Sequence, residues 1–153
     1  MLILPVKVRQ NTYALDTSRV IEVIPRVHLK EIPHTPEYVA GIFTYRGVIV
    51  PVIDLCMLLH NEPCAPLLGT RIVIVKYHGP GTEHILGLMA EQVTSIMETD
   101  QDSIKAAGVT AEAAPYLGDI ITDQQEMIQL VMADALVPDA LKEILFTDQK
   151  DLG

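Results

Sequence analysis

Apolar and β-branched residues recur along this chain in short runs that turn residues separate. Runs of this kind predict many short strands in a sandwich or barrel, and they leave little room for long helices. We therefore expect an all-β fold with a few short helices. The expected strands cover 2–8, 12–15, 20–24, 42–45, 48–53, 72–75, 85–89, 93–97, 120–121 and 127–132.

The segment 41–55 reads G-I-F-T-Y-R-G-V-I-V-P-V-I-D-L and has the clearest local pattern. Two β-branched and aromatic runs flank Arg46-Gly47, which is the turn signal between them. The pattern predicts a tight hairpin with Arg46 at its tip. Pro51 has no amide donor, so the second strand should lie at a sheet edge or carry a bulge there.

Three short helices are also expected. Asp54 can cap a helix that runs through Leu59, because its carboxylate can accept amide protons of the first turn. Asp100 or Asp102 could begin a second helix near 103–107, which the following glycine would end. A third helix is expected around Pro138, a residue suited to a first helical position, because the apolar residues there have helical spacing. Its apolar residues are Val137, Leu141, Ile144 and Leu145.

With 153 residues, 49% of them hydrophobic, the chain can form one domain with a substantial core. The proline-containing segment 61–66, followed by Gly69, is the best candidate linker and divides the chain into two strand-rich halves. No segment approaches the ~20 apolar residues of a membrane-spanning helix. The apolar opening 1–7 lacks the features of a signal peptide, so we interpret it as the first strand.

The two cysteines, Cys56 and Cys64, have the spacing of neither a zinc site nor a redox motif. We expect reduced thiols in a cytosolic setting, with Cys56 packed on an apolar helix face.

Charge is distributed unevenly in this chain of net charge −9. Residues 1–90 hold eight Lys/Arg and seven Asp/Glu, whereas residues 91–153 hold three and thirteen. An acidic half repels phosphate backbones, so nucleic acid is not an expected partner. The acidic residues can form a solvated surface that aids solubility, or a patch that faces a partner.

Recognisable catalytic or metal-binding patterns are missing from the sequence. Its histidines have no ligand spacing, and they are His28, His34, His60, His78 and His84. Pairs of carboxylates such as Asp100 and Asp102 are explained by turns and caps. We expect no catalytic residue, no cofactor and no metal site.

Five ordered motifs resemble those of CheW-type coupling domains. They are Y-A-L-D-T-S-R-V-I-E-V-I-P at 13–25, H-T-P-E-Y-V-A-G at 34–41, T-Y-R-G-V-I-V-P-V-I-D-L at 44–55, L-G-L-M-A-E-Q-V at 86–93, and Y-L-G at 116–118 before a closing M-A-D-A-L. Together they span nearly the whole chain and are more specific than any one motif. Thr44-Tyr45 stands where the family usually has Asn-Leu.

The resemblance implies two small five-stranded Src-homology-3-like barrels on a shared hydrophobic core. We expect one CheW-like domain over 1–153, with lobes near 1–66 and 67–153, the second with the C-terminal helix, and possible strand exchange between them. The implied role is a cytoplasmic adaptor at receptor arrays, without membrane insertion. Its implied partners are the cytoplasmic tip of methyl-accepting chemoreceptors and the regulatory domain of a CheA-type histidine kinase.

The resemblance also implies which residues contact partners. Arg46 would pair with Glu22 across neighbouring strands, at about 1 kcal/mol for a partly exposed pair. Receptor-contact positions map onto Val20, Gly41, Arg46 and Ile96, in a groove between the barrels that could accept a helix. Structural roles are the alternative for each. Tyr45, larger than the usual leucine, would influence receptor preference.

Two other functions remain open from the sequence. One is a small β-barrel enzyme or ligand-binding domain, which would need a pocket with convergent polar groups. The other is a coupling domain that scaffolds receptor arrays without activating the kinase.

Overall fold

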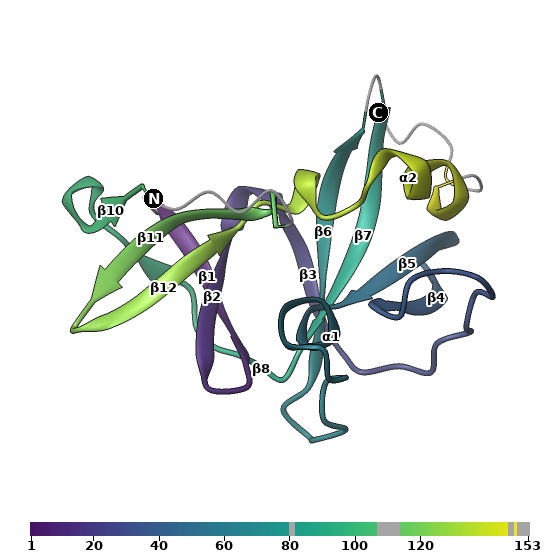
Figure 1. Cartoon of the computed structure of the whole chain (residues 1–153), viewed down its shortest axis with the longest axis horizontal. Helices are drawn as coiled ribbons and strands as arrows, with labels where there is room; N and C mark the ends of the chain where they lie inside the picture. Colours follow the sequence, from purple (N-terminus) through teal and green to yellow (C-terminus); the bar gives the residue numbers. More distant parts are fainter. Residues whose placement is uncertain (80–81, 107–113, 147–148, 150–153) are drawn as a thin grey trace.

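The computed structural model describes residues 1–79, 82–106, 114–146 and 149, and it contains two β-sheets that lie side by side (Figure 1). The larger sheet has the strand order β10-β11-β12-β2-β1-β8, and β9 also pairs with β1. Its strands are β1 (Leu2–Val8), β2 (Asn11–Asp16), β8 (Gln92–Val93), β9 (Met97–Glu98), β10 (Ile104–Lys105), β11 (Leu117–Asp123) and β12 (Glu126–Val131).

The smaller sheet has the order β3-β6-β7-β5-β4. Its strands are β3 (Val20–Pro25), β4 (Val39–Tyr45), β5 (Val48–Asp54), β6 (Arg71–Gly79) and β7 (Thr82–Ala90). Most neighbours in both sheets are antiparallel, but β12 pairs with β2 and β5 pairs with β7 in parallel. The all-β prediction is confirmed.

The chain passes between the sheets twice. It begins in the larger sheet with β1 and β2, builds the whole smaller sheet from β3 to β7, and then returns with β8 to β12. Each sheet therefore contains strands from both sides of the segment 61–66. The expected lobes, 1–66 and 67–153, are each continuous in sequence. The two sheets are not continuous, because each takes strands from both sides of that division.

Short helical segments lie between strands and after the last one. They are α1 (Leu55–His60) and α2 (Asp139–Leu145), with 3-10 turns η1 (Thr17–Arg19), η2 (Gln101–Ser103) and η3 (Ala133–Ala135). As predicted, Asp54 caps α1, because its carboxylate accepts the amide proton of Met57 at 3.1 Å. Asn61 ends the helix in the left-handed conformation, with φ of 59°.

The helix expected near 103–107 is wrong over the residues described. Gln101–Ser103 forms only a 3-10 turn, and β10 follows directly and pairs with β11. Pairing with β11 provides hydrogen-bond partners for the backbone N–H and C=O groups, which in a helix would have bonded to each other. The rest of that expected helix, from residue 107, lies outside the described part.

One hydrophobic core is shared by both sheets and α2. From the larger sheet it takes Val6 and Leu15, from the smaller sheet Ile53 and Leu88, and from α2 Leu141. A second, smaller cluster lies within the larger sheet alone, around Ile3, Ile121 and Ile128. The core thus joins two barrel-like halves into a single unit, as the fold prediction requires.

Pro51 does not lie on an edge strand, which corrects that prediction. β5 is internal, between β7 and β4. Proline is tolerated there because the ladder with β7 begins only at Val52, so no partner on that side needs an amide donor from Pro51. The ladder irregularity lies on β4 instead, between Val39 and Gly41.

Polar contacts hold the β1–β2 hairpin against the end of α1 and the segment that follows it, and we call this set the sheet clasp. Arg9 Nη2 lies 2.6 Å from Glu62 Oε2, and His60 Nε2 lies 3.4 Å from the Tyr13 hydroxyl. Glu91 accepts from Arg9 N at 2.8 Å with one oxygen and from Ala65 N at 2.9 Å with the other. The Ala65 amide, with Arg9 also contributing, holds the pKa of Glu91 below its usual value despite some burial.

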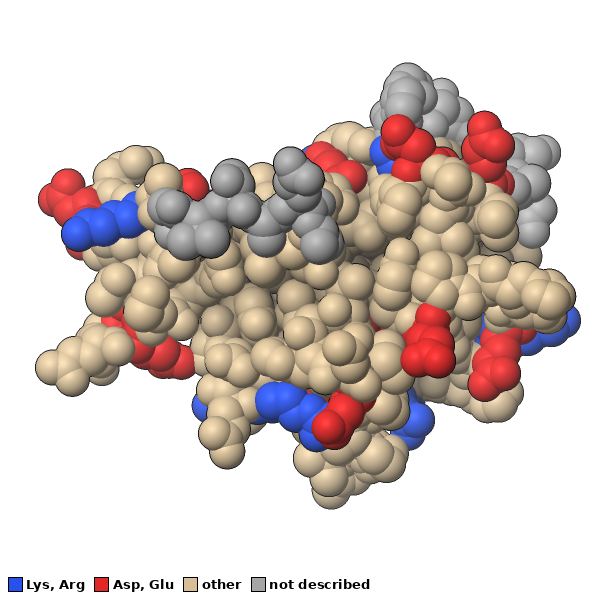
Figure 2. All heavy atoms as spheres, in the orientation of Figure 1, with Lys and Arg blue, Asp and Glu red and all other residues tan. Residues whose placement is uncertain are grey.

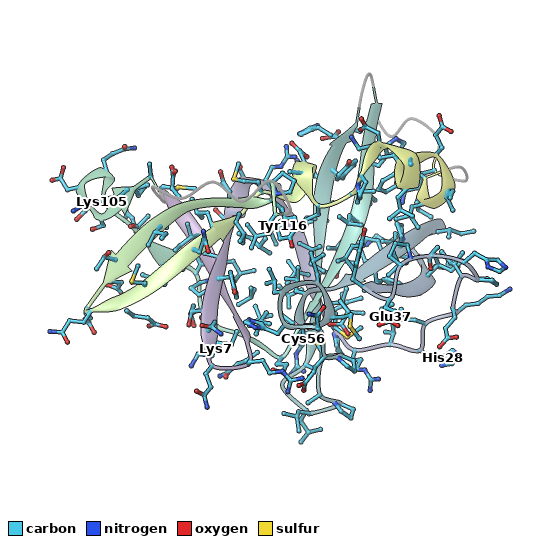
Figure 3. The ribbon with its side chains drawn as sticks, in the orientation of Figure 1. Lys7, His28, Glu37, Cys56, Lys105 and Tyr116 are labelled. Atoms are coloured by element: carbon cyan, nitrogen blue, oxygen red, sulfur yellow. A yellow bond between two sulfur atoms is a disulfide. The ribbon has the colours of Figure 1, made fainter. Side chains whose placement is uncertain are left out.

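Cys56 and Cys64 form a disulfide, contrary to the expectation of reduced thiols (Figure 3). Their Cα atoms lie 5.1 Å apart, within the range that a disulfide spans. The cause is local, because Asp54 also accepts the Cys64 amide proton at 3.0 Å and so folds the segment after α1 back onto the helix. Among the described residues, no helix is long and apolar enough to cross a membrane.

Candidate functional site

The β4–β5 hairpin has a two-residue turn made by Arg46 and Gly47. Tyr45 pairs with Val48 in register, and the two turn residues have φ of 49° and 80°. Two positive φ values in a two-residue loop are typical of a type I′ turn, which matches the right-handed twist of the strands. The prediction of a tight hairpin with Arg46 at its tip is confirmed, and the Arg46 side chain is 70% exposed.

Glu22, Tyr45 and Arg46 meet at this tip. The Tyr45 hydroxyl donates to Glu22 Oε2 at 2.9 Å, and Arg46 Nη2 donates to the same oxygen at 3.2 Å. Arg46 Cζ also lies 5.1 Å from the centroid of the Tyr45 ring. Burial raises the pKa of Tyr45, and its bond to Glu22 raises it further, so the phenol is a neutral donor near pH 7.

The Glu22–Arg46 pair does not join neighbouring strands as expected. Glu22 lies on β3 and Tyr45 ends β4, the opposite edges of the five-stranded sheet. In a flat sheet, four strand spacings would separate them by about 19 Å. Their contact therefore requires the sheet to curl until its edges meet, and the three side chains fix that closure.

The other predicted contact residues are more dispersed. Val20 begins β3 and packs against the shared core while partly exposed. Gly41, on β4, has φ of 145°, and a Cβ atom there would lie 2.6 Å from the Lys30 carbonyl oxygen, so this position demands glycine. Ile96 lies between β8 and β9 of the other sheet and is 60% exposed, so it is not a core residue.

Exposed apolar residues beside Glu22 were missed by the sequence reading. Ile21 and Val23 flank it on β3 and are 38% and 39% exposed. Val23 lies on the face opposite to Glu22, because successive residues of a regular strand alternate in direction, whereas Ile21 lies at the ladder irregularity between Val20 and Glu22. The V-I-E-V-I run indicated a strand but not that β3 is an edge strand with an uncovered apolar face.

A hollow of about 950 Å³ lies between the connection from β3 to β4 and the segment from α1 to β6. Residues in its wall include Arg26, Met57, Leu68 and Arg71, with Asp54 and Cys64 at its base. The Asp54 carboxylate already accepts backbone amide protons from Met57 and Cys64. It is thus a structural carboxylate, and the nearby sulfur atoms of Cys56 and Cys64 are bonded to each other.

Among the described residues on the face shown in Figure 2, the acidic side chains are spread between other residues and form no continuous patch. Basic residues are interspersed with them on the same face. This distribution favours the solvated-surface interpretation over a single acidic docking patch on that face.

The model of the CheW-like domain matches residues 2–141. The chain belongs to the CheW-like family. Chemotaxis protein CheW of Bacillus subtilis is 22% identical over 93% of this chain and 90% of its own length. Chemotaxis protein CheW of Klebsiella aerogenes is 24% identical over 82% of this chain and 74% of its own.

The crystal structure of the scaffolding protein TtCheW from Thermoanaerobacter tengcongensis has a similar fold. It superposes with a TM-score of 0.75 and 30% identity, covering 85% of this chain and 87% of that one. This CheW-like protein is accordingly a chemotaxis adaptor and not an enzyme.

Proposed function

We propose that this protein couples methyl-accepting chemoreceptors to a CheA-type histidine kinase, in the cytoplasm at receptor arrays. The observation that carries the proposal is the Arg46 guanidinium, which is exposed at a rigid hairpin tip and held in place by Glu22 and Tyr45. A side chain that is both exposed and fixed loses less conformational entropy on binding than a mobile one.

A receptor helix would bind along the edge of β3, with its apolar side against the partly uncovered Ile21 and Val23. A polar or acidic residue of that helix would reach around the strand edge to Arg46, which bonds to Glu22. Tyr45 orients the guanidinium through its ring and also holds Glu22. A leucine, usual in the family at this position, would offer neither contact. Tyr45 is therefore the residue that sets receptor preference in this proposal.

Reconstitution with a receptor signalling fragment and a CheA-type kinase tests the coupling. We expect the protein to raise the rate of kinase autophosphorylation and to co-elute with both partners on gel filtration. An unchanged rate with no complex would refute the proposal. Co-elution of all three without a change in rate would indicate instead a scaffold that does not activate the kinase.

Arg46→Asp should separate binding from folding. We expect receptor binding to weaken at least about ten-fold, because the variant puts a carboxylate where the receptor meets a cation. Stability should change little, because Asp-Gly suits a type I′ turn and an exposed ion pair contributes at most about 1 kcal/mol. The melting temperature should therefore fall by no more than about 4 °C.

Lys105→Asp is the matched control for that substitution. It makes the same change in net charge at an exposed residue of β10, at the far end of the larger sheet (Figure 3). We expect this control to bind like the unmodified protein. If Arg46→Asp lost stability in proportion to binding, the arginine would have only a structural role.

A further inference from the structure

The disulfide closes a small loop at the base of the hollow. Cys56 lies on α1 and is fully buried, whereas Cys64 lines the hollow and is 6% exposed. The two cysteines are eight positions apart, so the bond joins the first turn of α1 to the segment that follows the helix. A reagent in the hollow would reach the sulfur of Cys64 before that of Cys56.

The loop between the cysteines carries part of the sheet clasp. His60 contacts Tyr13, and Glu62 pairs with Arg9, both in the first hairpin of the larger sheet. Directly after Cys64, the amide of Ala65 donates to Glu91, whose other oxygen accepts from Arg9. The disulfide thus holds the smaller-sheet side of the contact between the sheets.

The local structure suits both oxidation states. The Asp54 carboxylate holds the amides of Met57 and Cys64 whether or not the sulfur atoms are joined. Cys64 Sγ lies 3.5 Å from the Met89 carbonyl oxygen, which can accept a hydrogen bond from a thiol but not from a disulfide. Cys56 would become a buried thiol, which packs as a small apolar group.

We propose that Cys56 and Cys64 form a reversible thiol–disulfide site, acted on by small dithiols or dithiol proteins, whose oxidation state sets how firmly the sheet clasp holds. The location of the protein in a reducing compartment rests on the proposed function. In such compartments disulfides of mesophilic proteins are usually transient and redox-sensing rather than structural.

Reduction proceeds by two exchanges. A thiolate of the reductant attacks Cys64 Sγ, the bond to Cys56 breaks, and Cys56 leaves as a thiolate that takes a proton. The reductant is then joined to Cys64 in a mixed disulfide. Its second thiolate attacks the reductant's sulfur in that bond and releases Cys64 as a thiolate, which also takes a proton. Two electrons and two protons pass to the protein, and the reductant becomes a disulfide.

Reduction removes the covalent closure but leaves the polar contacts, so the clasp opens more often. The amides of Ala65 and Arg9, which both donate to Glu91, report on this opening. We expect their hydrogen exchange to become at least about ten-fold faster in the reduced protein. The amide of Ile72, within β6, should accelerate less than these two, because it exchanges only when the sheet itself opens.

The test uses the full chain in buffers of reduced and oxidised dithiothreitol. Alkylation and mass spectrometry count the thiols under native conditions, and NMR follows the three amides. We expect two thiols to appear without unfolding and to pair again when the buffer is returned. The proposal is overturned by a bond that yields only on unfolding, by thiols that never pair, or by equal exchange of Ala65 and Arg9 in both states.

Variants provide the controls. Cys56→Ala/Cys64→Ala should exchange like the reduced protein in either buffer, and a response of this variant to the buffer would contradict the assignment. Alkylation should be fast at Cys64 in Cys56→Ala and slow at Cys56 in Cys64→Ala, and the reverse order would overturn the proposed attack on Cys64. Measurements on the unmodified chain decide the proposal if a variant fails to fold.

Neither receptor nor kinase enters these measurements. A failed reconstitution of kinase coupling would leave the redox result intact, and an irreducible disulfide would leave the coupling result intact. The two proposals can therefore fail independently.

Discussion

Asp54 is a buried residue that organises two adjacent pieces of chain. One oxygen of its carboxylate caps α1 through Met57, and the other holds the amide of Cys64, ten residues further on. Buried amides that lose an acceptor destabilise the fold more than exposed ones, because water cannot replace the acceptor. The cap and the return of the chain towards α1 are therefore coupled through one side chain.

Asp54→Ala should lower the free energy of unfolding by about 2 to 3 kcal/mol, combining a lost cap with an unpaired buried amide. Urea denaturation followed by circular dichroism measures the change. Asp100→Ala is the control, since Asp100 precedes η2 but makes no side-chain cap bond. A loss below about 0.5 kcal/mol is expected there. Equal losses in the two variants would show that Asp54 does not have the role assigned to it.

For single residues, the sequence was sufficient to predict roles that depend only on adjacent residues in the chain. The capping role of Asp54 follows from its place just before an apolar helical run, and Arg46 follows from its place before a glycine. The Tyr45–Glu22 hydrogen bond was not predictable, because it depends on a curl that brings opposite sheet edges together. The Cys56–Cys64 bond was missed because the fold-back after α1 has no spacing signature.

Among the elements, β4 has a backbone that its neighbours restrict closely at Gly41. Its ladder with β5 is irregular between Val39 and Gly41, and there Gly41 approaches the backbone of Lys30, whose amide and carbonyl bond to Ile42. The strand thereby holds the long connection from β3 against its own edge. That connection also forms one wall of the hollow.

Gly41→Ala should destabilise the protein more than Gly47→Ala. Both glycines have positive φ, but only at Gly41 would the added methyl meet a backbone oxygen, at 2.6 Å. We expect a loss above about 2 kcal/mol at Gly41 and about 1 kcal/mol at Gly47. Thermal unfolding of the two variants compares them, and a larger effect at Gly47 would contradict the proposed close approach.

Strand positions were predicted well where apolar runs were long. The expected strand at 2–8 coincides with β1, and those at 48–53 and 72–75 lie within β5 and β6. The expected strand at 93–97 was only partly right, because Val93 ends β8, Met97 begins β9, and the residues between them are not in strand register, although Thr94 N still donates to the Pro5 carbonyl oxygen. Single-sequence patterns do not show where a strand has a partner.

For the whole molecule, the sheet clasp links electrostatics to stability. The pKa of Glu91 is lowered in the folded state, so the folded protein binds a proton at Glu91 less readily than the unfolded chain does. The stabilisation that ionised Glu91 gives the folded state is therefore complete at pH values above the ordinary glutamate pKa. It is lost as the pH falls through the lower, folded-state pKa.

Glu91→Gln should consequently be less stable than the unmodified protein at pH 7, with a smaller difference at pH 3. Glutamine keeps one acceptor oxygen, so only one of the amides from Arg9 and Ala65 loses its partner. Urea denaturation at the two pH values gives the difference. Glu37→Gln removes the same charge from an exposed residue and should show little difference at either pH. A gap for Glu91→Gln that widened in acid would contradict the sign of the shift.

The order in which the chain visits the two sheets was beyond sequence reasoning. The parallel pairing of β12 with β2 joins segments more than a hundred residues apart, and no local pattern indicates it. The short apolar runs and the family motifs were sufficient to predict the fold class. Both can be recognised in the sequence without knowing which strands pair with each other.

The passage of the chain from one sheet to the other and back has a consequence for synthesis on the ribosome. A nascent chain that has emerged as far as Ala90 holds every strand of the five-stranded sheet, but only β1 and β2 of the other. Until β12 emerges, the edge of β2 remains an unpaired ladder next to apolar residues, which is a template for pairing with other chains. The first hairpin to be made is thus the one that waits longest for its partners, and the interval in which this protein is most exposed to aggregation is set by its topology.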